Sequence, residues 1–433
     1  MIAATKSTTE ITTSNVGFRP WLIVILGSVF YGYQFIIRVS PSMMTDELMG
    51  AFSIDATSLG IFTSCYYIAY SIAQIPLGIM LDRIGPRLLF AGCCAILAAG
   101  CLIFAETNNL YVACFARLLI GLGAACGFIG TLKLGTIWIP GHQFGRVVAI
   151  AVIFGTIGAV LGESPLEYLI NSVGWRDSLR ILGLFGSVLT AVLFVWLSND
   201  NPKIPYVQPP TKISSMISDL KVICFSGQVW LVSIYSMLMY MPLTIIGDLW
   251  GVSFVERAYH IQETAAATVI SMMFIGVFVG SPVFAILSDA MKNRRFPLFI
   301  AAFFNLVFYV VALYSQSIPI MVMYVLFFLV GFFFGGKSIG FTVVVESMPK
   351  SMSGATVGFV NTVIMSNGIL SLPLIGWLLD FGKNHYYPDS GGYLYSVENF
   401  RFALAIIPVS LALATLLVVW VKDSYPKEHL LQK

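Results

Sequence analysis

Apolar runs of about twenty residues recur along nearly the whole chain, and no other feature of the sequence restricts the fold as strongly. Each run is long enough to cross a bilayer, which takes roughly 20 apolar residues. Only 10% of the residues are charged, whereas a soluble domain has roughly 25%. A backbone in lipid must satisfy its own hydrogen bonds, so the runs have to be helices. The sequence therefore predicts an all-α membrane protein.

We predict twelve transmembrane helices, and an interior proline or glycine is compatible with them because neighbouring helices can satisfy the freed backbone groups. The predicted spans are residues 20–40, 57–80, 88–105, 110–132, 146–169, 178–197, 229–249, 264–287, 297–315, 319–342, 355–379 and 400–421.

The distribution of Lys and Arg predicts the orientation of these spans. With the N-terminus inside, fifteen of the 24 basic residues lie in inner segments, five in outer segments and four within spans. Basic residues are retained on the cytoplasmic side of a membrane protein. We therefore expect both termini to face the cytoplasm.

A polar linker and an internal repeat divide the chain into two similar halves. We expect a disordered N-terminus (1–18), a six-helix bundle (19–197), a cytoplasmic linker (198–228), a second six-helix bundle (229–421) and a cytoplasmic tail (422–433). In the repeat Asp82 aligns with Asp289, and Arg87 then aligns with Arg294. Two such halves, with the solute site between them at mid-membrane, are one common transporter layout.

The loop GIMLDRIGPR, from Gly78 to Arg87, lies between the second and third spans. A small residue such as Gly78 allows two helices to approach closely. We predict a gate latch formed by this loop and its repeat, which would stabilise the outward-open state through charge pairs and helix-end contacts. The residues assigned to the latch are Gly78, Asp82, Arg83, Arg87, Asp289 and Arg294.

This loop resembles the signature of the major facilitator superfamily, in which a glycine, an acid and several bases follow in a fixed order. The signature appears here as Gly78, Asp82, Arg83, Gly85 and Arg87, although Pro86 replaces a usual base. A second family element, an Arg followed by spaced glycines, appears as Arg117, Gly121, Gly123 and Gly127. The resemblance implies two pseudo-symmetric six-helix bundles and a cavity lined by the first, fourth, seventh and tenth helices.

A finer resemblance concerns the first span and the residues after it. The stretch YGYQFIIRVSPSMMTDEL is similar to the bacterial importers that include phagosomal amino-acid transporters. It implies an amino acid or similar nutrient as solute and a bacterial inner membrane as location.

Arg38 is the strongest candidate for a solute-binding residue. Tyr31, Gln34 and Arg38 are spaced three and four residues apart, so they share one helix face. Arg binds carboxylates and phosphates with two parallel hydrogen bonds. The alternative is that Arg38 extends to the outer headgroups.

Further solute-binding candidates are Lys133, Lys337 and Tyr235 in the fourth, tenth and seventh spans. Two cations facing one cavity would favour an anionic or zwitterionic solute. The alternatives are that the lysines are interfacial cations and that the tyrosine only packs between helices.

A coupling proton requires an enclosed carboxylate, and Glu163 in the fifth span is the best candidate. Its alternative role is an ion pair with Arg38 or Arg117. We expect Asp248 and Glu346 to lie near span ends, in contact with water.

Together these features predict a proton-coupled secondary transporter, a symporter, for a small polar, zwitterionic or anionic nutrient such as an amino acid, peptide or carboxylate. The alternatives are an efflux antiporter for amphipathic compounds and a membrane receptor. The sequence holds no P-loop or nucleophile elbow, which argues against an enzyme. We expect no cofactor, no metal and no nucleic-acid partner, and a monomer whose partners are the solute, the bilayer and protons.

Overall fold

The computed structural model describes residues 17–140, 143–199, 220–315, 318–349, 352–386 and 394–425. Within these ranges every regular element is helical. The predicted N-terminal tail up to residue 16, the centre of the linker (200–219) and residues 426–433 lie outside the described residues.

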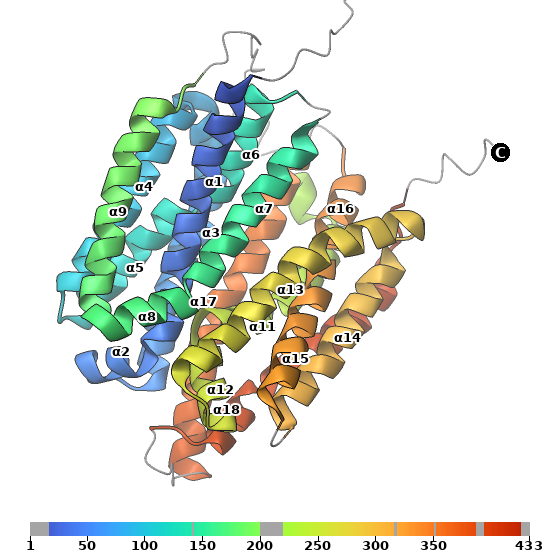
Figure 1. Cartoon of the computed structure of the whole chain (residues 1–433). Coiled ribbons are helices and arrows are strands. Elements are labelled where there is room, and N and C mark those ends of the chain that lie inside the picture. The colour runs from blue at the N-terminus through green and yellow to red at the C-terminus, as the bar shows by residue number, and fades with distance from the viewer. Residues whose placement is uncertain are drawn as a thin grey trace, which may run out of the picture.

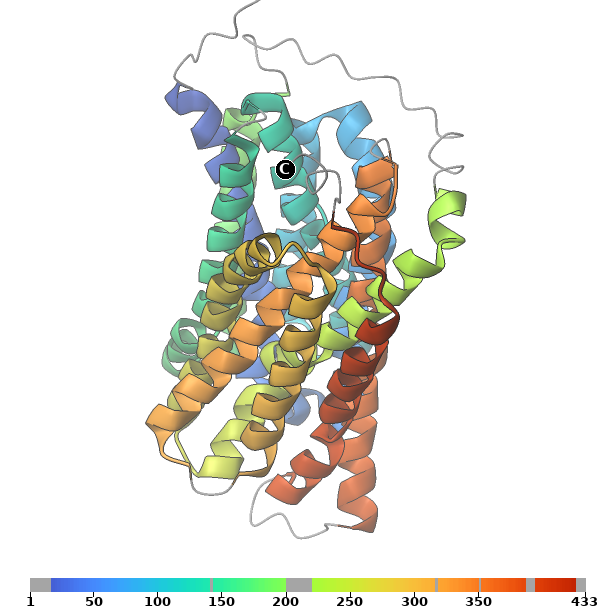
Figure 2. The same ribbon diagram turned by 90° about the vertical axis from the view of Figure 1, so that its right-hand side faces the viewer.

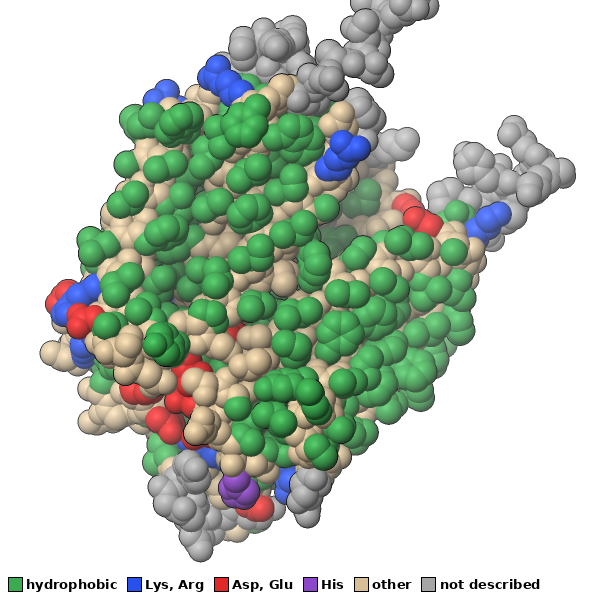
Figure 3. Space-filling model, viewed as in Figure 1, with side chains coloured by type: hydrophobic (Ala, Val, Ile, Leu, Met, Phe, Trp, Pro, Cys, Tyr) green, Lys and Arg blue, Asp and Glu red, His purple; other side chains and the backbone are tan. Residues whose placement is uncertain are grey.

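The predicted all-α membrane fold is confirmed. Eleven helical segments of the described chain are long and apolar enough to cross a membrane, and a twelfth is counted if two helices that meet at 108°, 45–52 and 56–74, form one broken span. Apolar side chains cover the flanks of the molecule and charged ones gather towards its two ends (Figure 3).

The N-terminal half contains the first six spans, the second of which is the broken span formed by residues 45–52 and 56–74. Its helices are α1 (Phe18–Val39), η1 (Ser40–Met43), α2 (Thr45–Phe52), α3 (Ala56–Ile84), α4 (Pro86–Glu106), α5 (Leu110–Ala124), α6 (Gly127–Trp138), α7 (Phe144–Leu161), α8 (Ser164–Val173) and α9 (Trp175–Trp196).

The C-terminal half contains the other six spans. Its helices are α11 (Gly227–Pro242), η3 (Leu243–Trp250), α12 (Gly251–Tyr259), α13 (Glu263–Ala290), α14 (Arg295–Tyr314), α15 (Ile320–Phe334), η4 (Gly335–Ser338), α16 (Ile339–Glu346), α17 (Ser353–His385), α18 (Val397–Leu404), α19 (Ile406–Leu417) and η6 (Val418–Trp420).

Several spans are interrupted near the middle of the bundle. The seventh passes from α11 into the π-helical turns of η3 directly after Pro242, whose ring removes a backbone donor from the helix interior. The tenth passes through the 3-10 turn η4, which begins with Gly335 and Gly336. Irregular turns of this kind occur at functional sites.

The seventh span is longer than the sequence predicted. It continues without a loop through η3 and α12 to Tyr259, ten residues beyond the predicted end at 249. The expectation that Asp248 lies near a span end in contact with water is therefore wrong, and its side chain is only 1% exposed.

The two halves lie side by side and cross at an angle, as two perpendicular views show (Figures 1 and 2). We call the end at which α1 begins and α9 ends the upper end, and the end that carries α2, α12 and α18 the lower end (Figure 1). The largest contact between the halves joins α3 to α17. A Cβ atom added at Gly376 would lie 2.1 Å from the Ala56 carbonyl oxygen, so small residues set this approach.

Candidate functional site

A buried ion pair joins the two halves at the centre of the bundle. The Arg38 guanidinium donates from Nη2 to Asp248 Oδ2 at 2.9 Å and from Nε to the same oxygen at 3.3 Å. The Arg38 and Asp248 side chains are 4% and 1% exposed. Arg38 thus points into the bundle, and it does not extend to the headgroups.

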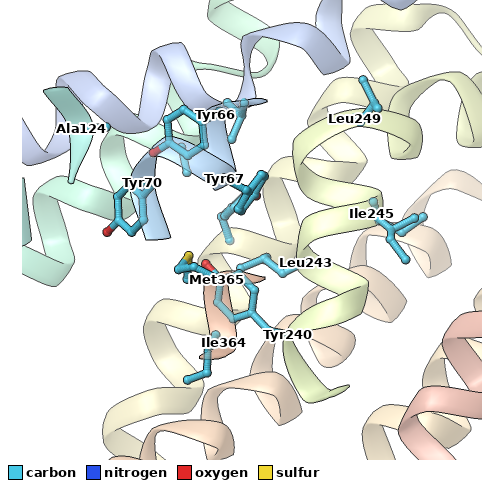
Figure 4. Packing of buried hydrophobic residues seen from close by; sticks show 14 of the residues in the cluster. Tyr66, Tyr67, Tyr70, Ala124, Tyr240, Leu243, Ile245, Leu249, Ile364 and Met365 are labelled. Atoms are coloured by element: carbon cyan, nitrogen blue, oxygen red, sulfur yellow. The ribbon is translucent and has the colours of Figure 1, made fainter. Parts of the chain in front are cut away.

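Two tyrosines complete the polar cluster around this pair. Arg38 Nη2 lies 3.0 Å from the hydroxyls of Tyr67 on α3 and Tyr240 on α11. The Tyr67 hydroxyl also donates to Asp248 Oδ2. Figure 4 shows Tyr67 and Tyr70 of the N-terminal half facing Tyr240, Leu243 and Met365 of the C-terminal half. Each half therefore contributes one tyrosine, Tyr67 or Tyr240, to the polar cluster.

A cavity of about 210 Å³ lies beside the ion pair, between the two halves. Its wall contains residues of all four helices that the family resemblance implied, together with α3, α7, α13 and α17. The polar and charged side chains of the wall are Tyr31, Gln34, Arg38, Tyr70, Thr156, Tyr240, Ser281, Lys337, Ser338 and Asn361.

Lys337 is the second cation of the cavity wall. It lies in the 3-10 turn η4, and its Nζ is 4.5 Å from the centre of the Tyr240 ring and 5.4 Å from that of Phe341. Aromatic faces stabilise an ammonium group without neutralising it. Arg38 and Lys337 are the charged residues of this wall within the described chain.

The structure brings together some of the predicted solute-binding residues and separates others. Tyr31 and Gln34 line the cavity with Arg38, and Gln34 Oε1 accepts a hydrogen bond from Tyr66 at 2.9 Å. Tyr235 lies elsewhere, fully buried, and donates to the Leu298 carbonyl oxygen at 2.8 Å. Lys133 is also absent from the cavity wall. We therefore no longer include Tyr235 and Lys133 among the binding candidates.

Glu163 occupies the break between α7 and α8 and is fully buried. Neither of its carboxylate oxygens has a hydrogen-bond partner among the described residues. Arg38 pairs with Asp248, while the equally buried Arg117 donates to the Ile37 carbonyl oxygen at 3.2 Å. The alternative role of Glu163, an ion pair with either arginine, is not formed in this structure.

The predicted latch residues of the C-terminal half lie at the upper end. Arg294 binds Asp289 at 2.5 Å and Glu346 at 2.8 Å, and its backbone N–H donates to Asp423. All of these partners belong to the same half.

The predicted latch residues of the N-terminal half are also at the upper end. Arg87 bonds to Phe194 within its own half and to Asn199 at the start of the linker, and Arg83 is exposed. A Cβ atom at Gly78 would meet no described atom within 4 Å, so the predicted close helix approach is absent in this state. The Asp82 side chain lies outside the described part of the chain.

Sequence reasoning missed the acid of the central ion pair. The predicted seventh span ends at residue 249, directly after Asp248, which places this acid in contact with water. The signal that could have found it is the continued apolar pattern after the acid, in LWGVSFV, which extends the span. An ionisable group in the middle of a span is a functional candidate by default.

A bundle of membrane-spanning helices with a cavity between its two halves is one common transporter architecture. The chain belongs to the Major Facilitator Superfamily, whose family model matches residues 22–372 and 251–432, and this membership identifies a multi-pass membrane transporter and not an enzyme.

Comparisons with individual proteins agree with this assignment. The chain is 24% identical over 397 residues to the probable galactarate/D-glucarate transporter GudP of Escherichia coli (strain K12), covering 83% of this chain and 87% of that protein. It is 24% identical over 385 residues to the membrane sensor protein UhpC of Salmonella typhimurium, covering 84% and 85%. The fold is similar to a crystal structure of a bacterial homolog of the human lysosomal transporter Spinster, with a TM-score of 0.77, 14% identity and 94% and 98% coverage.

Proposed function

We propose that this protein is a secondary transporter for a small organic anion that carries a carboxylate group, and that it works by alternating access. The observation that carries the proposal is the placement of Arg38 and Lys337 in the wall of one cavity between the halves. A guanidinium binds a carboxylate through paired hydrogen bonds, while an ammonium acts as a point charge. A buried surplus of positive charge is costly until an anion compensates it.

The relatives support an anion over the zwitterion that the first-span resemblance implied. One relative is named as a probable transporter of galactarate and D-glucarate, both of which are sugar diacids. The described cavity wall contains no Asp or Glu that could pair with the ammonium group of an α-amino acid, and Asp248 lies outside this wall, bonded to Arg38. We therefore rank carboxylate anions above amino acids.

We further propose that the upper end faces the cytoplasm, in a bacterial inner membrane, and that the halves correspond to residues 19–197 and 229–421. The excess of Lys and Arg in the segments at this end supports the orientation. The state described here is then closed towards the outside. The latch residues at the upper end, Asp82 included, would engage across the halves only in the opposite state.

Glu163 remains our proposed proton carrier. Its buried carboxylate without a partner is expensive to ionise, which is the property that a proton-binding group needs. Glu163→Gln should abolish gradient-driven accumulation and spare counterflow exchange. Accumulation at the normal rate would exclude this role.

Uptake into proteoliposomes tests the proposed function. The panel contains aldonates, aldarates, hexose phosphates and amino acids, each with and without a pH gradient. We expect saturable uptake of a carboxylate anion, at least tenfold weaker in Arg38→Ala and in Lys337→Ala, while Lys422→Ala, an exposed cation remote from the cavity, transports normally.

Three results would contradict the proposal. Full uptake of the anion by Arg38→Ala would remove the cavity from the pathway. Transport of amphipathic cations alone would support an efflux antiporter. Anion binding without uptake would support a sensor, the role that the printed name gives to one relative.

A further inference from the structure

We propose that Asp248 sets the charge of the anion that this site accepts, by cancelling one of the two cations. The inference rests on the proposed function, because it concerns the solute of that same cavity. With Asp248 ionised, the site carries one surplus positive charge and accepts one negative charge: a monoanion, or a dianion together with a proton.

The geometry places Asp248 behind Arg38 as seen from the cavity. Arg38 belongs to the cavity wall and Asp248 does not. Arg38 uses Nε and Nη2 to bind a single carboxylate oxygen, Oδ2. Asp248 thus binds the guanidinium on the side away from the cavity. It lowers the net positive charge of the site without occupying the cavity in which the solute would bind.

The second carboxylate oxygen indicates that this arrangement serves more than packing. Asp248 Oδ1 is buried and has no hydrogen-bond partner among the described residues. An unsatisfied buried acceptor costs free energy that a purely structural ion pair could avoid. The π-helical turns of η3 hold the carboxylate in this position, and such turns often mark functional sites.

Lys337 supplies the surplus charge. Its described contacts are with aromatic rings, among them Tyr240, which also binds Arg38. Arg117 and Glu163 are buried near the cluster but outside the cavity wall. Neither residue is changed in any of the variants proposed below.

Charge-changing variants at two positions test the inference. Gluconate and glucarate form a matched pair, since both are six-carbon sugar acids that differ by one carboxylate. Binding is measured by ligand-induced thermal stabilisation of the full-length protein, and uptake by proteoliposomes, both at one mildly acidic pH at which the sugar acids are ionised and a buried ammonium beside a guanidinium keeps its proton. The wild type should prefer gluconate.

Asp248→Asn should change this preference towards glucarate by about tenfold, which corresponds to about 1.4 kcal/mol. Asp248→Glu should keep the wild-type preference. The double variant Asp248→Asn/Lys337→Gln returns the site to one surplus charge, so it should regain the preference for gluconate even where its overall affinity is lower.

Two results would overturn the inference while leaving the proposed function intact. One is an unchanged gluconate-to-glucarate ratio in an Asp248→Asn protein that still binds anions. The other is a double variant that keeps the preference of the single variant. If the wild type binds and transports no anion of either charge, the proposed function itself fails.

Discussion

The two ends of the helix pair α3 and α17 behave differently, although the same two helices are involved. At the lower end, Cβ atoms added at Gly60 and Gly376 would lie 2.4 and 2.1 Å from backbone oxygens of the partner helix. At the upper end, Gly78 on α3 and Gly354 and Gly358 on α17 meet no described atom within 4 Å. Helices α3 and α17 are therefore in close contact at the lower end and separate towards the upper end.

Polar contacts follow the same division. At the lower end they join the halves: Asp380 on α17 accepts hydrogen bonds from the backbone N–H groups of Ala56 and Thr57 at 3.3 and 2.9 Å. At the upper end the contact of Arg87 with Phe194 and that of Arg294 with Glu346 remain within one half. The lower-end contacts therefore stabilise the conformation described here. The upper-end residues are available to form contacts between the halves in the opposite conformation.

The largest expected effect comes from Gly376→Leu, which places a side chain against the Ala56 backbone. Overpacking of a tight contact costs up to about 3 kcal/mol, or about a hundredfold in population. We expect the lower end to open and transport to be lost. The measurement is the labelling rate of Ser42→Cys, a buried lower-end reporter, by an impermeant maleimide in a chain whose native cysteines are replaced by alanine.

Gly78→Leu is the matched control at the other end of the same helix pair. It should leave the labelling of Ser42→Cys low, because its side chain meets open space in this state, and should still reduce transport by obstructing upper-end closure. Equal labelling in the two leucine variants would contradict the comparison.

Asp380→Ala should have the next largest effect. Asp380 caps the start of α3 from the other half and also binds Tyr395 at 2.5 Å. Loss of such a cap costs up to about 2 kcal/mol, equivalent to about thirtyfold in population. We expect faster labelling of the Ser42→Cys reporter by roughly that factor.

Asp55→Ala provides the control, because Asp55 caps the same helix from within its own half through Ser58 N–H at 2.9 Å. It should lower thermal stability without changing the labelling rate. If both variants increase labelling equally, the effect of Asp380 is a general loss of helix stability.

Asp46→Ala should have a smaller effect. The Arg257 guanidinium binds both oxygens of Asp46 across the halves, at 2.7 and 2.9 Å, but the Asp46 side chain is 56% exposed. The Arg257 side chain is only 1% exposed, so its loss of a carboxylate partner costs more than loss of an exposed pair, which contributes up to about 1 kcal/mol. We expect about five- to tenfold faster labelling, with a smaller increase at high salt. Acidic side chains gather nearby at the lower seam (Figure 3), and their mutual repulsion opposes closure.

The charge exchange Asp46→Arg with Arg257→Asp distinguishes this pair from a local packing effect. The double variant should recover slow labelling, whereas each single variant should not. Fast labelling in the double variant would show that the ion pair does not hold the lower end.

Ser164→Ala should have the smallest effect. The Ser164 and Thr268 hydroxyls lie 2.8 Å apart between α8 and α13, and a neutral hydrogen bond contributes about 0.5–1.5 kcal/mol. Because this pair is only partly buried, we expect the lower limit of about 0.5 kcal/mol, which corresponds to about twofold faster labelling. Ser187→Ala, which loses a bond within its own helix, is the control and should change nothing.

The sequence predicted the lining of the candidate cavity only in part, and the differences have physical causes. The polar spacing of Tyr31, Gln34 and Arg38 identified one helix face correctly as cavity-lining. The same reasoning placed Tyr235 in the cavity, although its hydroxyl binds α14. Helical periodicity shows which side chains share a face, but it does not show whether that face lies towards the cavity or a neighbouring helix.

The sequence alone determined the all-α membrane fold, because apolar length and backbone hydrogen bonding leave a chain in lipid no other structure. It also determined the division into two similar halves. Only the tertiary structure decided that Asp248 pairs with Arg38, since the partners are 210 residues apart and meet where two helices cross. The tertiary structure also decided which end is closed, because closure depends on contacts between helices that no local pattern records.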